Sequence, residues 1–150
     1  MRNIFRTFAV VVTAAAIGAG CSSSYKGLSK AEFVKQANAI CTQGNKDADV
    51  VSKQITAKST AADVGKLFTD KVAPILTRVF DQIDALKPPK ADRDQVKKIT
   101  SEGRDGLKKF LADVNADPKA AFSQATDPLK QSQDDAKAYG LTVCGTSSSN

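Results

Sequence analysis

The chain has 150 residues, of which 41% are hydrophobic and 25% charged, and its formal net charge is +6. These values are typical of one globular domain and argue against disorder throughout. Histidine and tryptophan are absent, and Met1 is the only methionine. Composition therefore excludes a catalytic histidine, a Ser-His-Asp relay, a His-ligated zinc ion and a His- or Met-ligated haem. We expect no cofactor, no metal site, no catalytic residue and no enzyme activity.

The first 20 residues have the three parts of an export signal. Arg2 and Arg6 precede an apolar segment that begins at Phe8, and small residues follow up to Cys21. The apolar segment has about 13 residues, fewer than the roughly 20 that a membrane-spanning helix needs. We therefore predict a lipoprotein signal peptide over residues 1–20, whose removal lowers the formal charge from +6 to +4.

Cys21 follows the run Gly18-Ala19-Gly20, which resembles the lipobox of bacterial lipoproteins. In such proteins a signal peptidase cuts before the cysteine, whose thiol carries diacylglycerol with acyl chains such as palmitate. Gly18 departs from the larger aliphatic residue that is usual at its position. Two or more acyl chains give stable membrane anchoring. We expect lipidation of Cys21; the alternative is ordinary signal cleavage and a secreted protein with an unpaired thiol.

A polar tether, residues 21–28, connects the expected lipid anchor to the folded part. Fully extended, this tether reaches at most about 25 Å, so the folded part is expected close to the membrane. We place the helical domain at residues 29–145 and a disordered polar tail at residues 146–150. The predicted location is the extracytoplasmic face of the cell membrane.

The sequence LSKAEF indicates the start of a helix. Ser29 and Glu32 are spaced as a capping box. Leu28 and Phe33, on either side of them, are spaced as a hydrophobic staple. Apolar or small residues then recur at helical spacing, which predicts a helix that reaches about Ala57. The members of this face are Phe33, Ala37, Ile40, Gly44, Ala48, Val51 and Ile55. Gly44 either lets a neighbouring helix approach closely or weakens the middle of this helix.

A second helix, capped by Ser59 or Thr60, carries the richest apolar stripe in the chain. The stripe consists of Val64, Phe68, Val72, Ile75, Val79, Ile83 and Leu86. Because Pro74 interrupts the stripe, we expect a kink near residues 70–73.

A third helix opens near Asp92, after the Pro88-Pro89 pair has ended the second. Asp94 and Lys98 are spaced as an i,i+4 ion pair on this third helix.

Two Asp-Pro pairs then predict two short helical pieces, residues 118–125 and 128–139, because proline is favoured in the first turn after an acidic cap. Gly140 is placed to end the second piece, and the segment up to Cys144 is expected to run extended over the bundle. No strand-like alternation of useful length occurs. The predicted fold is an all-α antiparallel four-helix bundle with a broken last helix.

If Cys21 is acylated, Cys41 and Cys144 remain, and two remaining cysteines in an exported protein usually form a disulfide. This bond would attach the tail to the first helix and contribute roughly 4–5 kcal/mol of stability. A redox-active or metal-binding pair is the alternative. This alternative has no support in the sequence, because neither cysteine is in a CxxC arrangement and the chain has no histidine.

Three segments, LSKAEFVKQANAIC, LKPPKADRDQV and AYGLTVCG, resemble those of small uncharacterised lipoproteins and secreted proteins of actinobacteria. The resemblance covers most of the chain after the leader. It implies an exported helical domain with Cys41 paired to Cys144. That group has no assigned activity, so the resemblance identifies no catalytic or binding residue.

Basic residues surround the Pro88-Pro89 turn. They are Lys87, Lys90, Arg93, Lys97 and Lys98. A solvated helix start is the ordinary interpretation, and contact with an anionic lipid or wall polymer is the alternative. Nucleic acid is not an expected partner, because no aromatic platform accompanies these residues and the leader directs the chain out of the cell.

The sequence favours a membrane-anchored lipoprotein of the cell envelope that acts as a non-catalytic interaction or structural module. Its partners would be the membrane, through the lipid anchor, and an envelope protein or an anionic wall polymer or lipid; the oligomeric state is left open. Such a module predicts no deep pocket. The alternative is a carrier of a small apolar ligand or lipid, which predicts a cavity on the order of 300 Å³ in the bundle interior. The expected lining is Phe68, Val72, Ile75 and Val79.

Overall fold

The structure, a computed structural model, describes residues 25–124 and 126–146. All regular secondary structure in these two stretches is helical. The predicted signal peptide, the expected lipidation site Cys21 and the last four residues of the tail lie outside the described residues.

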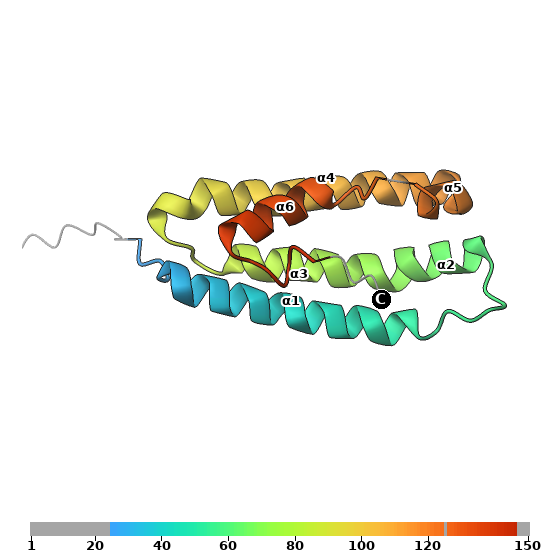
Figure 1. Cartoon of the computed structure of the whole chain (residues 1–150), viewed down its shortest axis with the longest axis horizontal. Coiled ribbons are helices and arrows are strands. Elements are labelled where there is room, and N and C mark those ends of the chain that lie inside the picture. Colours follow the sequence, from blue (N-terminus) through green and yellow to red (C-terminus); the bar gives the residue numbers. More distant parts are fainter. Residues whose placement is uncertain (1–24, 125, 147–150) are drawn as a thin grey trace, which may run out of the picture.

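Three long helical segments lie side by side and form the body of the bundle (Figure 1). Helix α1 (Lys30–Ser52) packs against α3 (Ala73–Ala85), which continues from α2 (Ala61–Leu67), and α3 packs against α4 (Arg93–Ala116). Successive segments run in opposite directions (Figure 1). The predicted all-α antiparallel bundle is confirmed.

Two short helices complete the bundle. Helix α5 (Pro118–Phe122) packs against α2 and α4, and α6 (Lys130–Tyr139) packs along α4 (Figure 1). The predicted break between them is also confirmed. Helix α6 starts two residues later than predicted, because the Asp127 carboxylate accepts the Leu129 N–H at 2.8 Å and holds a turn there.

Two capping boxes set the starts of α1 and α2. At α1, the Ser29 hydroxyl accepts the Glu32 N–H at 3.3 Å, and the Glu32 carboxylate accepts the Ser29 N–H at 3.0 Å. Thr60 and Asp63 make the same pair of bonds at α2. Because the hydroxyl of Ser29 also donates to Glu32, these bonds lower the pKa of that carboxyl. Local side-chain chemistry therefore fixes both helix starts.

Helix α1 ends at Ser52, before the predicted end at Ala57. The Thr56 N–H donates to the Ser59 hydroxyl at 3.0 Å, and the Ser59 N–H donates to the Thr56 carbonyl at 3.0 Å. These local bonds compete with the helical ladder, and Ile55, which was expected on the buried face, is 44% exposed.

A π-helical turn (Phe68–Val72) separates α2 from α3. Pro74 has no N–H to donate, and its ring crowds the carbonyl one turn earlier. The chain accommodates Pro74 by a wider turn, in which the Ala73 N–H donates to the Phe68 carbonyl, five residues back. This irregularity lies where the sequence predicted a kink.

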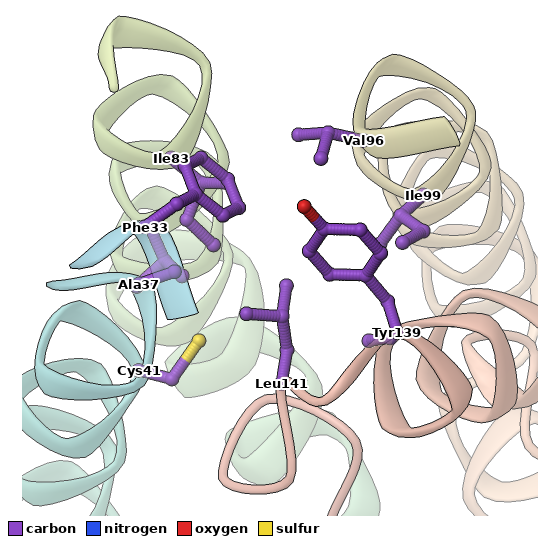
Figure 2. Packing of buried hydrophobic residues seen from close by; sticks show 10 residues of the cluster. Phe33, Ala37, Cys41, Ile83, Val96, Ile99, Tyr139 and Leu141 are labelled. Carbon is purple, nitrogen blue, oxygen red and sulfur yellow. The ribbon is translucent and has the colours of Figure 1, made fainter. Parts of the chain in front are cut away.

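The main cluster of buried hydrophobic residues lies where the first half of α1 and the start of α4 meet the ends of α3 and α6 (Figure 2). Phe33 and Leu141 are 0% and 1% exposed. The Phe33 and Tyr139 rings meet edge to face at 6.0 Å, and the Tyr139 hydroxyl donates to Asp92 at 2.8 Å. Burial, followed by this bond to a carboxylate, raises the pKa of Tyr139 well above its ordinary value.

The disulfide predicted between Cys41 and Cys144 is present and attaches the tail to α1. Asn38 reinforces the attachment, because its amide donates to the Gly140 carbonyl at 3.3 Å and accepts the Val143 N–H at 3.0 Å. The tail starts at Gly140, whose φ of 111° suits glycine and ends α6 as predicted. After Gly140 the tail folds into a turn, whereas the sequence predicted an extended segment up to Cys144.

Gly44 of α1 lies against Val79 of α3. A Cβ atom there would stand 2.5 Å from Cγ2 of Val79. Of the two interpretations left open by the sequence, close approach of a neighbour is the one observed. The predicted Asp94–Lys98 pair was wrong, because Lys98 instead forms ion pairs with Glu102, at 2.8 Å, and with Asp135 of α6.

Candidate functional site

A partly open cavity of about 290 Å³ lies between α1, α3, α4 and α6, next to the packed core. Its lining is mostly apolar. Aliphatic side chains contribute much of the wall, namely Leu76, Val79, Ile83, Ile99, Leu129 and Leu141. Because apolar and aromatic side chains from several helices line this cavity, it is the main candidate for a functional site.

Three phenylalanine rings form the aromatic part of the wall: Phe68, Phe80 and Phe110. The Phe68 and Phe110 rings meet edge to face at 4.9 Å, and both rings contact Phe122 behind them. Edge-to-face pairs hold aromatic rings in defined orientations. The wall is therefore preformed on this side.

The π-helical turn determines which side chains of the second apolar stripe reach the cavity. Of the four residues expected to line it, Phe68 and Val79 do, whereas Val72 and Ile75 do not. The expectation was wrong for these two because it continued α-helical spacing through residues 68–72, where the helix instead makes a wider turn.

The tail and the disulfide form another part of the wall. Cys41, Cys144 and Thr146 line the cavity together with Leu141. The disulfide therefore holds the tail in place as a boundary of the cavity. Sequence reasoning identified the bond but not this second role, which depends on where the tail crosses the bundle.

The polar side chains of the lining are largely occupied by other protein groups. Thr100, which is 1% exposed, donates to Asp84 at 2.7 Å, and Ser132 donates to the Ile99 carbonyl at 2.8 Å. Asp127 accepts a bond from Gln133 at 3.0 Å. Among the described residues that line the cavity, Asp127 is the only charged one, and none is lysine or arginine.

Three aspartates that lie close to another aspartate in the sequence form ion pairs with basic side chains. Asp47 contacts Arg78, Asp134 contacts Lys130 at 2.7 Å, and Asp135 contacts Lys98. Within residues 25–124 and 126–146, no group of three or more histidine, cysteine, aspartate or glutamate side chains is close enough to hold a metal ion.

No helix in the described part of the chain is long and apolar enough to cross a bilayer. Comparisons with family models, with curated proteins and with solved structures gave no match. The case for function therefore depends on the geometry of the cavity and on the surface of the bundle.

Proposed function

We propose that this protein is a membrane-anchored carrier of the cell envelope that binds a small apolar molecule in the cavity beside the disulfide. The observation that carries the proposal is the cavity of about 290 Å³, lined by three phenylalanine rings and a set of aliphatic side chains. Because this lining offers water few polar partners, an apolar ligand that replaces water in the cavity gains affinity. A purely structural module favours a solid interior, so the cavity supports a carrier instead.

The lining also indicates the chemical class of the ligand. Because no lysine or arginine of the described residues lines the cavity, a carboxylate ligand would be buried without a counter-charge. Asp127 favours a neutral or an amine-bearing ligand. The volume is about twice that of the apolar cavities of roughly 150 Å³ that take up benzene, so the ligand has one or two rings or a short alkyl chain.

Three features support the membrane anchor and the export that the proposal includes. The leader and Cys21 have the pattern of a lipoprotein, as does the polar tether that follows. Disulfides persist mainly outside the cytoplasm, and the chain has one. Mass spectrometry of the membrane-extracted protein tests the anchor, since it reports the acyl mass on Cys21 and the first residue of the mature chain.

Ligand binding is tested with the chain from residue 21 onward carrying Cys21→Ser. The probe is 6-propionyl-2-(dimethylamino)naphthalene, a neutral two-ring dye whose fluorescence shifts to the blue in an apolar site. We expect saturable binding of one dye per chain. Decanol and decylamine should displace the dye, whereas decanoate should displace it at least about tenfold less well, because its buried charge has no partner.

A pair of variants locates the dye. Leu76→Trp fills the cavity and should weaken dye binding at least about tenfold. Leu111→Trp enlarges a half-buried leucine of α4 outside the lining and should leave dye binding unchanged. Thermal unfolding of both variants checks that each is folded. Absence of saturable binding, or equal loss in the two variants, contradicts the proposed carrier.

A further inference from the structure

The end of the bundle at which the described chain begins carries an excess of positive charge. Residues 25–32 and 86–97 contain six basic and three acidic residues, whereas residues 49–63 and 113–124 at the opposite end contain three basic and four acidic residues. We call the first group the basic end. Its basic residues are Lys26, Lys30, Lys87, Lys90, Arg93 and Lys97.

All six basic side chains are exposed, and none forms an ion pair with a carboxylate of the described residues. Two of the three acidic residues are already occupied: Glu32 by the capping box with Ser29, and Asp92 by the Tyr139 hydroxyl. Along the sides of the bundle, by contrast, Lys98 and Arg104 each contact two carboxylates. The positive charge of the basic end is therefore open to an external anion.

A hollow of about 380 Å³ lies in the basic end. Its basic members are Lys87, Arg93 and Lys97, and its apolar members are Tyr25, Leu86, Pro88 and Val96. Two carboxylates also line the hollow, but Asp84 is bound to Arg104 at 2.7 Å, which leaves Asp94 against three cations. The hollow thus combines apolar side chains with an excess of positive charge.

The chain enters the bundle at this same end and is fixed there. The Tyr25 hydroxyl donates to the Pro88 carbonyl at 2.6 Å, and the Arg93 guanidinium lies 4.7 Å from the centre of the Tyr25 ring. The Leu28 N–H donates to the Lys87 carbonyl at 2.7 Å. Cys21 is four residues before Tyr25, within about 14 Å of it at full extension.

We propose that the basic end docks on the surface of a membrane rich in anionic phospholipid, with lipid phosphates around the hollow. Lysine and arginine both bind phosphate oxygens, and arginine can do so through two parallel bonds. Clusters of basic residues beside a membrane anchor are attracted to anionic lipid. The acyl chains on Cys21 and the basic end then act on the same bilayer.

The Tyr25 side chain favours a membrane over a soluble anionic polymer. It lines the hollow, is 36% exposed and matches the boundary between headgroups and acyl chains, where tyrosine side chains are enriched. A sugar-phosphate polymer has no such boundary. The inference goes beyond the proposed carrier and does not depend on whether the interior cavity is occupied.

The test uses the chain from residue 21 onward with Cys21→Ser, so that no acyl chain contributes. All of the described helices and the disulfide lie within this chain. Sedimentation with vesicles of phosphatidylglycerol and phosphatidylcholine should show binding that raised salt reverses, since salt screens exposed charges. Vesicles of pure phosphatidylcholine should not bind.

Two triple variants with the same change in net charge locate the surface. Lys87→Gln, Lys90→Gln and Lys97→Gln together should weaken binding to the anionic vesicles on the order of 100-fold. The matched control, Lys53→Gln, Lys58→Gln and Lys119→Gln, changes three exposed lysines at the other end and should weaken it less than about threefold. The proposal would be overturned if the two triple variants lost equal amounts of vesicle binding, or if the chain bound neutral vesicles as well as anionic ones. Binding to isolated anionic wall polymer without binding to vesicles would also overturn it.

Discussion

Two neighbouring regions of the same bundle differ in how they use apolar side chains. Around Phe33 and Tyr139 the chain is closely packed, and Leu141 of the tail completes the contact (Figure 2). Between the π-helical turn and the disulfide, side chains of the same helices instead surround about 290 Å³ of space. The number of apolar residues is therefore not what separates the two regions.

Backbone geometry accounts for the difference. At the packed end, α1 and α6 are regular up to their caps, and the Asn38 amide holds the tail against them. Near the cavity, Pro74 forces a wider turn just as the stripe of the second helical segment passes α4. We infer that stability is concentrated in the packed region and that the cavity region is the part able to adjust to a ligand.

Removing the disulfide should have the largest effect, because the disulfide belongs to both regions. Cys41→Ser with Cys144→Ser should lower the free energy of unfolding by roughly 4–5 kcal/mol, since the bond constrains a very long loop in the unfolded chain. Urea denaturation measures the change, with Cys21→Ser as a control that should unfold like the wild type. A loss below about 1 kcal/mol would mean that the tail is held without the bond.

A matched pair of truncations tests the contrast in packing directly. Phe33→Ala removes a side chain with 0% exposure and should cost about 3–5 kcal/mol. Leu76→Ala removes a half-buried side chain that already faces empty space, and it should cost less than about 2 kcal/mol, because few contacts are lost. Thermal and urea unfolding of the two variants provide the comparison. Similar costs would show that the two regions do not differ in stability.

Tyr139→Phe gives the smallest of these effects and adds a pH dependence. Loss of the bond to Asp92 should cost about 1 kcal/mol near neutral pH. Burial and that bond raise the pKa of Tyr139 in the folded chain above its ordinary value of 10.0. Above pH 10.0 the Tyr139 hydroxyl of the unfolded chain releases its proton, whereas that of the folded chain still holds it. The free energy of unfolding of the wild type therefore falls as pH rises. Tyr139→Phe has no hydroxyl and lacks this pH dependence.

Unfolding should therefore be measured for both proteins from neutral pH to beyond pH 10. The stability difference between wild type and Tyr139→Phe should narrow along this series. A difference that stays constant or widens would contradict the raised pKa. Val114→Ala removes a side chain of α4 that is 2% exposed and lies far along the helix from Asp92 and Tyr139, so it serves as a destabilised control with the wild-type pH slope.

The features that could be predicted from the sequence depend on neighbours along the chain. Ser29 with Glu32, and Thr60 with Asp63, specify their helix starts through side chains that reach only one turn. Gly140 ends α6 because of its own backbone freedom. The start of α1 and the end of α6 were predicted correctly, and the cap of α2 was narrowed to Ser59 or Thr60, because few alternatives compete with such local bonds.

The features that could not be predicted depend on three-dimensional contacts. Lys98 was expected to pair with Asp94 but meets Asp135, a residue of α6 that the sequence places far away. The cavity has the size predicted for a carrier, which the sequence supported only as the alternative to a module without a deep pocket. Its expected lining was wrong for Val72 and Ile75, because a single proline changed the helical register. The roles of Phe80 and the tail in the wall had no signal in the spacing of apolar residues.

The disulfide also sets an order in time. Cys144 comes after every helix of the described chain, so the ribosome delivers its thiol only when all of those helices have been made. The disulfide between Cys41 and Cys144 therefore forms late, because a chain that stops before Cys144 lacks one of the two thiols. A truncated product keeps a free thiol on α1, which marks it chemically as unfinished.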